Sequence, residues 1–139
     1  VRTVNNSDGM DKAEQIADRD FDGICFVNLV DFDMVYGHRN DAVGYAAALN
    51  DFSSRLEGFT KKMRDDDVLF VTADHGCDPS TPSTDHSREY VPLIAYGKNI
   101  RPINLGTMPT YACIAKTVCD MLGVKNSLAG ESFYAKIRK

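Results

Sequence analysis

The chain has 139 residues, of which 43% are hydrophobic and 26% are charged, and its formal net charge is −4. This length suits one globular domain with a core of its own. The mild acidity argues against a nucleic-acid-binding module, because such modules carry basic surfaces. No apolar run approaches the ~20 residues of a membrane-spanning helix, so we expect neither a membrane span nor a signal peptide.

The first half of the chain predicts two helices on either side of one strand. A helix is expected over Met10–Asp20, with Ser7 and Asp8 as caps. Gly23–Val30 is almost continuously apolar, which is typical of a strand covered on both faces. A long helix is expected over Asp41–Met63, where apolar residues recur at three- and four-residue steps. These apolar residues are Tyr45, Ala48, Leu49, Phe52, Leu56, Phe59 and Met63.

The second half predicts two more strands, one helix and a short element near the end of the chain. Val68–Thr72 is a second buried strand, and Tyr90–Tyr96 is a third, with Pro92 placing it at a sheet edge or at the start of the pairing. A helix is expected over Thr110–Leu122, and a short element follows at Phe133–Ile137. Because strands alternate with helices, the sequence predicts an α/β fold with a mostly parallel sheet flanked by helices.

Four cysteines are spread along the chain with no Cys-x-x-Cys pair among them. They are Cys25, Cys77, Cys113 and Cys119. Their spacing argues against a structural zinc site or a thioredoxin-like redox motif. We expect free, buried thiols in a reducing compartment, and therefore a cytoplasmic protein.

All three histidines of the chain lie in polar segments beside the predicted strands. These segments are Asp31–Asp41, Thr72–Asp78 and Thr84–Glu89. In α/β sheets, ligands bind outside the carboxyl ends of the strands. A single such segment is explained equally well by a helix-capping aspartate or a surface histidine. Three of them together, each with aspartates, favour one shared metal site.

The candidate metal ligands are Asp33, His38, Asp74, His75 and His86. Mixed imidazole and carboxylate ligands suit zinc, manganese or iron. Neighbouring side chains in a strand point to opposite faces, but Asp74 and His75 can turn toward one ion where the strand ends. Five ligands are more than one open catalytic ion needs, so two ions about 3.5–4 Å apart are expected.

Glycines next to these ligands are expected to shape the site. Gly37 supplies a bend that brings Asp33 and His38 together, and Gly76 permits a sharp exit after the Asp-His pair. Cys77 is the one thiol to test as a ligand, although soft sulfur beside hard oxygen ligands disfavours manganese.

Three further aspartates have predicted supporting roles. Asp31 and Asp85 are expected to orient the histidines from outside the ligand shell. Asp78 is expected to cap its own loop instead of orienting a histidine.

Three motifs carry a resemblance to a known family. Thr72–Gly76, with the sequence TADHG, resembles the metal motif of the alkaline phosphatase superfamily. Asn28–Arg39 and Thr84–Pro92 narrow the resemblance to the phosphopentomutase family. The five-residue step from Asp33 to His38 is the discriminating feature, because the related cofactor-independent phosphoglycerate mutases have a step one residue shorter. The resemblance covers nearly the whole chain.

The resemblance implies an isomerase that interconverts the 1-phosphate and 5-phosphate of ribose or deoxyribose. Such enzymes use two manganese ions, a phosphorylated threonine and a bisphosphorylated sugar that activates the cycle. By matching position, Asp33, His38 and His86 would hold one ion, and Asp74 and His75 would supply part of the second site. Zinc stays open as an alternative metal, since it accepts the same ligands.

The chain departs from the family in what it lacks. A further metal-binding aspartate, the nucleophilic threonine and the cap domain have no counterpart here, and the chain opens on Val1 without a methionine. Residues 1–139 are therefore expected to form a single partial domain, the C-terminal part of an alkaline-phosphatase-like catalytic core.

Expectations about activity and partners follow from that partial coverage. The isolated chain should be inactive as a mutase and should partner the missing N-terminal part or a second copy of itself. Its small-molecule partners would be pentose phosphates. Three alternatives stay open: another superfamily enzyme, such as a phosphoglycerate mutase or a phosphatase; a non-catalytic metal-binding domain; or a purely structural interaction domain.

Overall fold

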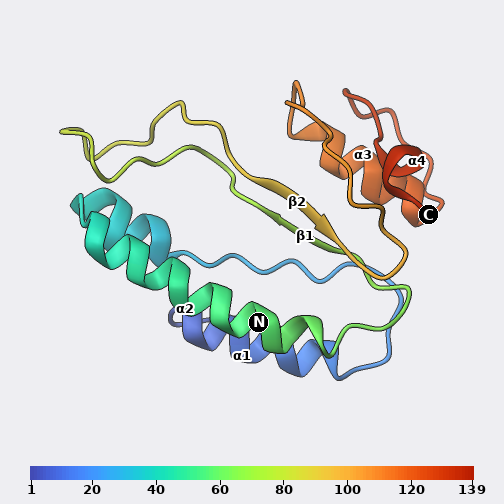
Figure 1. The fold of residues 1–139 in the computed structure, drawn as a ribbon, viewed down its shortest axis with the longest axis horizontal. Coiled ribbons are helices and arrows are strands. Elements are labelled where there is room, and N and C mark those ends of the chain that lie inside the picture. Colours follow the sequence, from blue (N-terminus) through green and yellow to red (C-terminus); the bar gives the residue numbers. More distant parts are fainter. The chain divides into compact units, whose positions relative to one another are not determined.

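The computed structural model describes all 139 residues, and these form two compact units. The first unit comprises Val1–Arg64 with Leu69–Ile94, and the second comprises Asp65–Val68 with Ala95–Lys139. The elements (Figure 1) are α1 (Asn6–Ala17), a π-helical turn (Phe32–Tyr36), a 3-10 turn (Gly37–Arg39), α2 (Ala42–Thr60), β1 (Leu69–Thr72), β2 (Leu93–Tyr96), α3 (Ala112–Met121) and α4 (Tyr134–Ile137). None of the helices is long and apolar enough to cross a membrane.

Both helices predicted in the first unit are confirmed, and polar side chains fix where they begin. α1 starts earlier than expected, because the side chain of Asn5 accepts a hydrogen bond from the Asp8 N–H. The predicted caps, Ser7 and Asp8, were therefore wrong: both lie inside the helix. α2 begins after Asp41, whose carboxylate accepts from the Gly44 N–H at 2.8 Å.

The side chain of Arg55 ties α2 to α1 within this unit. Its guanidinium donates to the carbonyl of Ser7 at 2.8 Å and to the carboxylates of Asp11 and Glu14. The bond to Glu14, together with the contact to Asp11, raises the pKa of Arg55 against the opposing effect of burial. Several bonds from one planar group fix orientation better than a single surface ion pair does.

The expected strand over Gly23–Val30 is wrong: the segment is an irregular stretch that belongs to no sheet. A strand needs a hydrogen-bonded neighbour, and the main chain here pairs with none. The side chain of Leu29 packs close to Gly9 of α1, but Phe26 is 85% exposed. Cys25 is also exposed, which corrects the expectation that every cysteine is buried.

The other two predicted strands are confirmed, although they do not form a parallel sheet. β1 and β2 pair with each other in a two-stranded antiparallel sheet. β2 begins one residue after Pro92, as expected for a residue that cannot donate to the ladder. The mostly parallel sheet is therefore not formed by this chain, because its predicted first strand is missing from the pairing.

The second unit packs α3 and α4 around a small core; the predicted helix is confirmed as α3, and the predicted short element is the helix α4. Its buried apolar residues are Ile100, Cys113, Phe133 and Ile137. Thr117 is fully buried among them, and its hydroxyl donates to the carbonyl of Cys113 at 2.8 Å while it accepts from the Phe133 N–H at 3.0 Å. One buried hydroxyl thus links the two helices.

Replacing Thr117 by valine tests that link. The substitution keeps the volume but removes both hydrogen bonds, so we expect the free energy of unfolding to fall by about 1–3 kcal/mol. Denaturant titration of the chain measures it. The matched variant at the exposed Thr107 should be within about 0.5 kcal/mol of wild type. Equal effects of the two variants would contradict a structural role for the buried hydroxyl.

Candidate metal centre

A π-helical turn brings the first two candidate ligands together. In such a turn the hydrogen bonds span five residues, as the Gly37 N–H does in reaching the carbonyl of Phe32. Asp33 lies in this turn and His38 in the 3-10 turn that directly follows it, and Asp33 Oδ2 lies 3.4 Å from His38 Nε2. The approach of Asp33 and His38 was predicted, whereas the π turn was missed. The five-residue spacing was the available signal for that turn.

Gly37 is needed in this turn because another segment approaches it closely. A Cβ at Gly37 would lie 2.5 Å from the sulfur of Cys77 and 3.1 Å from the carbonyl oxygen of Phe32. Burial, followed by the nearby charges of Asp33 and Asp78, raises the pKa of the Cys77 thiol. Cys77 thus packs beside the ligands as a neutral thiol and is not one of the residues that converge.

A second close approach, between the backbones at Gly76 and Ser87, positions His75 and His86. Gly76 and Ser87 form an antiparallel bridge in which the Ser87 N–H donates to the Gly76 carbonyl at 3.0 Å. A Cβ at Gly76 would collide with the carbonyl of Ser87 and lie 2.5 Å from the nitrogen of Glu89. Because each bridge residue follows a histidine, His75 and His86 come to lie side by side. Their rings stack with centroids 3.6 Å apart and planes 16° from parallel.

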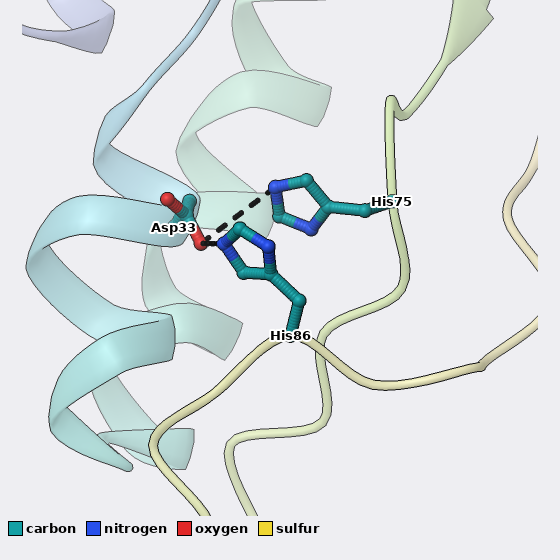
Figure 2. A group of neighbouring side chains, drawn as sticks. All are labelled: Asp33, His75 and His86. Atoms are coloured by element: carbon teal, nitrogen blue, oxygen red, sulfur yellow. Dashed lines mark ion pairs between the residues drawn. The ribbon is translucent and has the colours of Figure 1, made fainter.

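Asp33, His75 and His86 form the group whose ligand atoms converge. Figure 2 shows the Asp33 carboxylate, on its helical turn, facing two imidazole rings that come from separate stretches of chain. Asp33 Oδ1 lies 3.4 Å from His86 Nε2 and 3.9 Å from His75 Nε2. One ligand atom from each of the three residues fits within 4.8 Å of the others.

Two of the histidines are oriented by backbone carbonyls. His38 Nδ1 lies against the carbonyl of Thr84, and His75 Nδ1 lies 3.1 Å from the carbonyl of Gly76. A carbonyl oxygen only accepts, so Nδ1 carries the hydrogen in each of these contacts. The lone pair of a neutral ring is then on Nε2, the nitrogen that faces Asp33.

The remaining predicted residues lie around this group in different ways. Asp74 places its Oδ1 3.6 Å from His75 Nε2, but its side chain is 80% exposed. The carboxylate of Asp31 accepts from the Asn6 N–H at 2.8 Å, so its partner is α1 rather than a histidine. The carboxylate of Asp78 accepts from the N–H and hydroxyl of Ser80, which is the loop-capping alternative.

One oxygen of the group lacks a hydrogen-bond donor, and a bound cation would compensate for it. Asp33 Oδ1 is buried and has no hydrogen-bond partner. A buried carboxylate oxygen without a donor is costly, whereas a divalent cation bound there supplies the opposite charge. Imidazole nitrogens and a carboxylate are also the ligands that zinc, manganese and iron accept. The residues present therefore fit a metal ion.

Comparison with known proteins agrees with this chemistry. Residues 1–126 match the metalloenzyme superfamily. The chain belongs to this superfamily. The predicted resemblance to the phosphopentomutase family is also confirmed, because proteins of that name are about 50% identical to this chain in sequence.

Three curated relatives of this chain are named phosphopentomutase. The protein of Acetivibrio thermocellus is 56% identical over 138 residues, 99% of this chain and 36% of its own length. The protein of Carboxydothermus hydrogenoformans is 54% identical over 138 residues, 99% of this chain and 35% of its own length. The protein of Lachnoclostridium phytofermentans is 52% identical over 140 residues, 100% of this chain and 36% of its own length. The chain thus spans about a third of the length of these relatives.

Replacing Gly76 by alanine tests whether the bridge holds the histidines together. The added methyl would push Ser87 and Glu89 away, so we expect a loss of about 1–3 kcal/mol in the free energy of unfolding. Chemical shifts of the His75 and His86 rings should change as well. Heteronuclear NMR and denaturant titration measure the two effects.

The control is the same substitution at Gly58, which lies in α2 with open space around its Cβ position. Alanine there should leave the ring shifts unchanged and raise stability by up to about 1 kcal/mol through helix propensity. If Gly76→Ala behaved like Gly58→Ala, the close approach would not be what sets the two rings.

Proposed function

We propose that this chain is the C-terminal, metal-binding part of the catalytic core of a phosphopentomutase, an isomerase acting on (deoxy)ribose 1-phosphate and 5-phosphate. The observation that carries the proposal is the Asp33 carboxylate, with a buried unpartnered oxygen facing imidazoles. It occurs in a chain that is about half identical to proteins named phosphopentomutase. The three relatives share that name, which favours this activity over a phosphoglycerate mutase or a phosphatase.

The proposed ligand sets divide the five residues between two ions. Asp33, His38 and His86 hold one ion, while Asp74 and His75 contribute to the second. In support, the two oxygens of Asp33 face different imidazoles, Oδ2 toward His38 and Oδ1 toward the stacked pair. A carboxylate that faces ligands on two sides suits a paired site better than a single ion.

Two manganese ions are the proposed occupants, with zinc as the alternative. Bound together, they would neutralise charge that spreads over the phosphoryl oxygens during transfer. The residues of this chain hold the ions in place: backbone carbonyls fix the rings of His38 and His75, so that Nε2 of each is presented to the metal. Asp33 supplies the negative charge, with its buried Oδ1 facing the stacked rings of His75 and His86.

The rest of the catalytic core is proposed to come from sequence outside this chain. The nucleophilic threonine, a further metal-binding aspartate and the cap domain belong to that part, and so do strands that would complete a mostly parallel sheet. In support, the relatives are nearly three times as long as the stretch they share with this chain. The isolated chain would then bind metal without catalysing mutase turnover. Four free cysteines support the cytoplasm as the proposed compartment.

Metal binding is the first consequence to measure. Mn²⁺ binds only the folded site, so at a hundredfold excess over its dissociation constant it should stabilise the chain by about 2.7 kcal/mol. Asp33→Asn and His86→Ala should each remove most of that stabilisation. The control Asp66→Asn, at an exposed carboxylate, should keep it. Thermal unfolding with and without Mn²⁺ gives the result, and no shift for the wild-type chain would rule out the metal site.

A chimera tests the mutase activity itself. The matching 138 residues of the Acetivibrio thermocellus relative are replaced by this chain, and conversion of ribose 1-phosphate is followed. We expect the chimera to be active, the isolated chain to be inactive, and Asp33→Asn in the chimera to lower kcat by about a hundredfold or more. Asp66→Asn in the chimera should stay active. A folded, metal-loaded chimera without mutase activity would contradict the proposed function.

A further inference from the structure

A loop outside the ligand group contacts the ring of His38. This segment, residues 78–84, is called the 78–84 loop below. We infer that Asn40 and the 78–84 loop act as a positioning device for His38, keeping the hydrogen on its Nδ1 and the lone pair on its Nε2. The inference rests on the proposed metal-binding function and assigns a role to Asn40, which is not a ligand.

The first step is the contact between the loop and the ring. His38 Nδ1 lies against the carbonyl of Thr84, 46 residues further along the chain. Because the carbonyl cannot donate, this contact selects the form of the neutral ring that carries hydrogen on Nδ1. That form is the minor one for a histidine side chain free in water. The position of Thr84 therefore decides which nitrogen of His38 is available to a metal.

The second step is what holds the loop. Asn40 Nδ2 donates to the carbonyl of Thr81 at 3.0 Å, while Asn40 Oδ1 is buried and has no partner. The hydrogen bond from its side-chain amide to Thr81 is thus the polar contact that fixes this side chain. Asn40 also ends the 3-10 turn that carries His38, with its own N–H donating to Gly37. One residue therefore joins the ligand-bearing turn to the loop that orients the ligand.

The backbone of Asn40 shows that the position is constrained. Its φ of 53° is in the left-handed region, and it is the non-glycine residue of the chain with a positive φ. Asparagine tolerates this conformation better than most residues, and glycine adopts it without strain. The site therefore needs both a left-handed backbone and an amide donor, and substitutions can separate these two requirements.

The third step is the stiffness of the loop between its two contacts. The carboxylate of Asp78 accepts from the Ser80 N–H at 2.9 Å and from its hydroxyl at 2.6 Å. The Thr81 N–H and hydroxyl both donate to the Asp78 carbonyl. Thr84 is only three residues further along, a span of at most roughly 11 Å. Holding Thr81 in this closed turn consequently restricts where the Thr84 carbonyl can lie.

The test variant is Asn40→Gly, which keeps the left-handed backbone and removes the amide donor. The first measurement is ¹⁵N NMR of the His38 ring in the metal-free chain, well above the usual titration range of histidine. We expect the Nδ1–H signature in the wild type and a shift toward the Nε2–H form in the variant. The second measurement is Mn²⁺ affinity, which we expect to fall by about tenfold.

The matched control is Asn126→Gly in the second unit. Asn126 Nδ2 donates to the carbonyl of Val124 at 3.3 Å, so the same type of bond is lost at a site remote in sequence from the ligands. Both readouts should stay at wild-type values there. If Asn40→Gly does not fold by circular dichroism, the isosteric Asn40→Asp replaces it for the ring measurement, since a carboxylate cannot donate to Thr81.

The outcomes separate this inference from the proposed function. A folded Asn40 variant that retains the Nδ1–H signature and the wild-type affinity would overturn the positioning role. If the wild-type chain bound no Mn²⁺, the proposed function would fail, yet the ring spectra would still decide the role of Asn40. A loop anchor that served stability alone would lower the melting temperature without changing the hydrogen position on His38.

Discussion

The unpartnered oxygen of Asp33 is the constraint on which the rest of the site depends. Burying a carboxylate oxygen without a donor opposes folding, and the neighbouring imidazoles offset this only by donating or by sharing a cation. The ring contacts favour the second case. His38 and His75 direct their Nδ1 hydrogens to backbone carbonyls, which leaves a lone pair on His75 Nε2 facing Asp33 Oδ1 and another on His38 Nε2 facing Asp33 Oδ2. Two acceptors and a carboxylate converging on one another make sense around a positive ion.

Two glycines allow three separate segments to meet at that oxygen. Gly37 lets the Cys77 segment pack against the π turn, and Gly76 lets the Ser87 segment bridge to the strand end. In both cases the reason for glycine is space rather than an unusual backbone angle, because a Cβ would overlap a neighbouring atom. The expected roles of these glycines were a bend at Gly37 and a sharp exit at Gly76, and the close approach of a distant segment was missed.

The candidate ligands could be selected from the sequence because their chemistry is local to short motifs. Asp33 and His38 are five residues apart, and the π turn followed directly by the 3-10 turn brings their side chains within 3.4 Å. The helices follow from the same kind of local pattern. The segment Gly23–Val30 could not be assigned this way, since its apolar run indicates burial between neighbours and the pairing depends on which other segments are present. The parallel sheet failed with it, because the two remaining strands pair with each other in antiparallel fashion.

The stacking of His75 on His86 constrains the charge that the two imidazole rings can carry. Two positively charged rings with centroids 3.6 Å apart would repel each other, so the stack suits neutral rings. Neutral rings are also the form that binds metal, and metal binding displaces protons from histidine. The stacked arrangement and the proposed metal binding therefore favour the same charge state. Asp33 lies in a short helical turn, whereas His75 and His86 come from loops joined by an isolated bridge, so an ion bound among the three would stabilise their arrangement as well as supply the proposed chemistry.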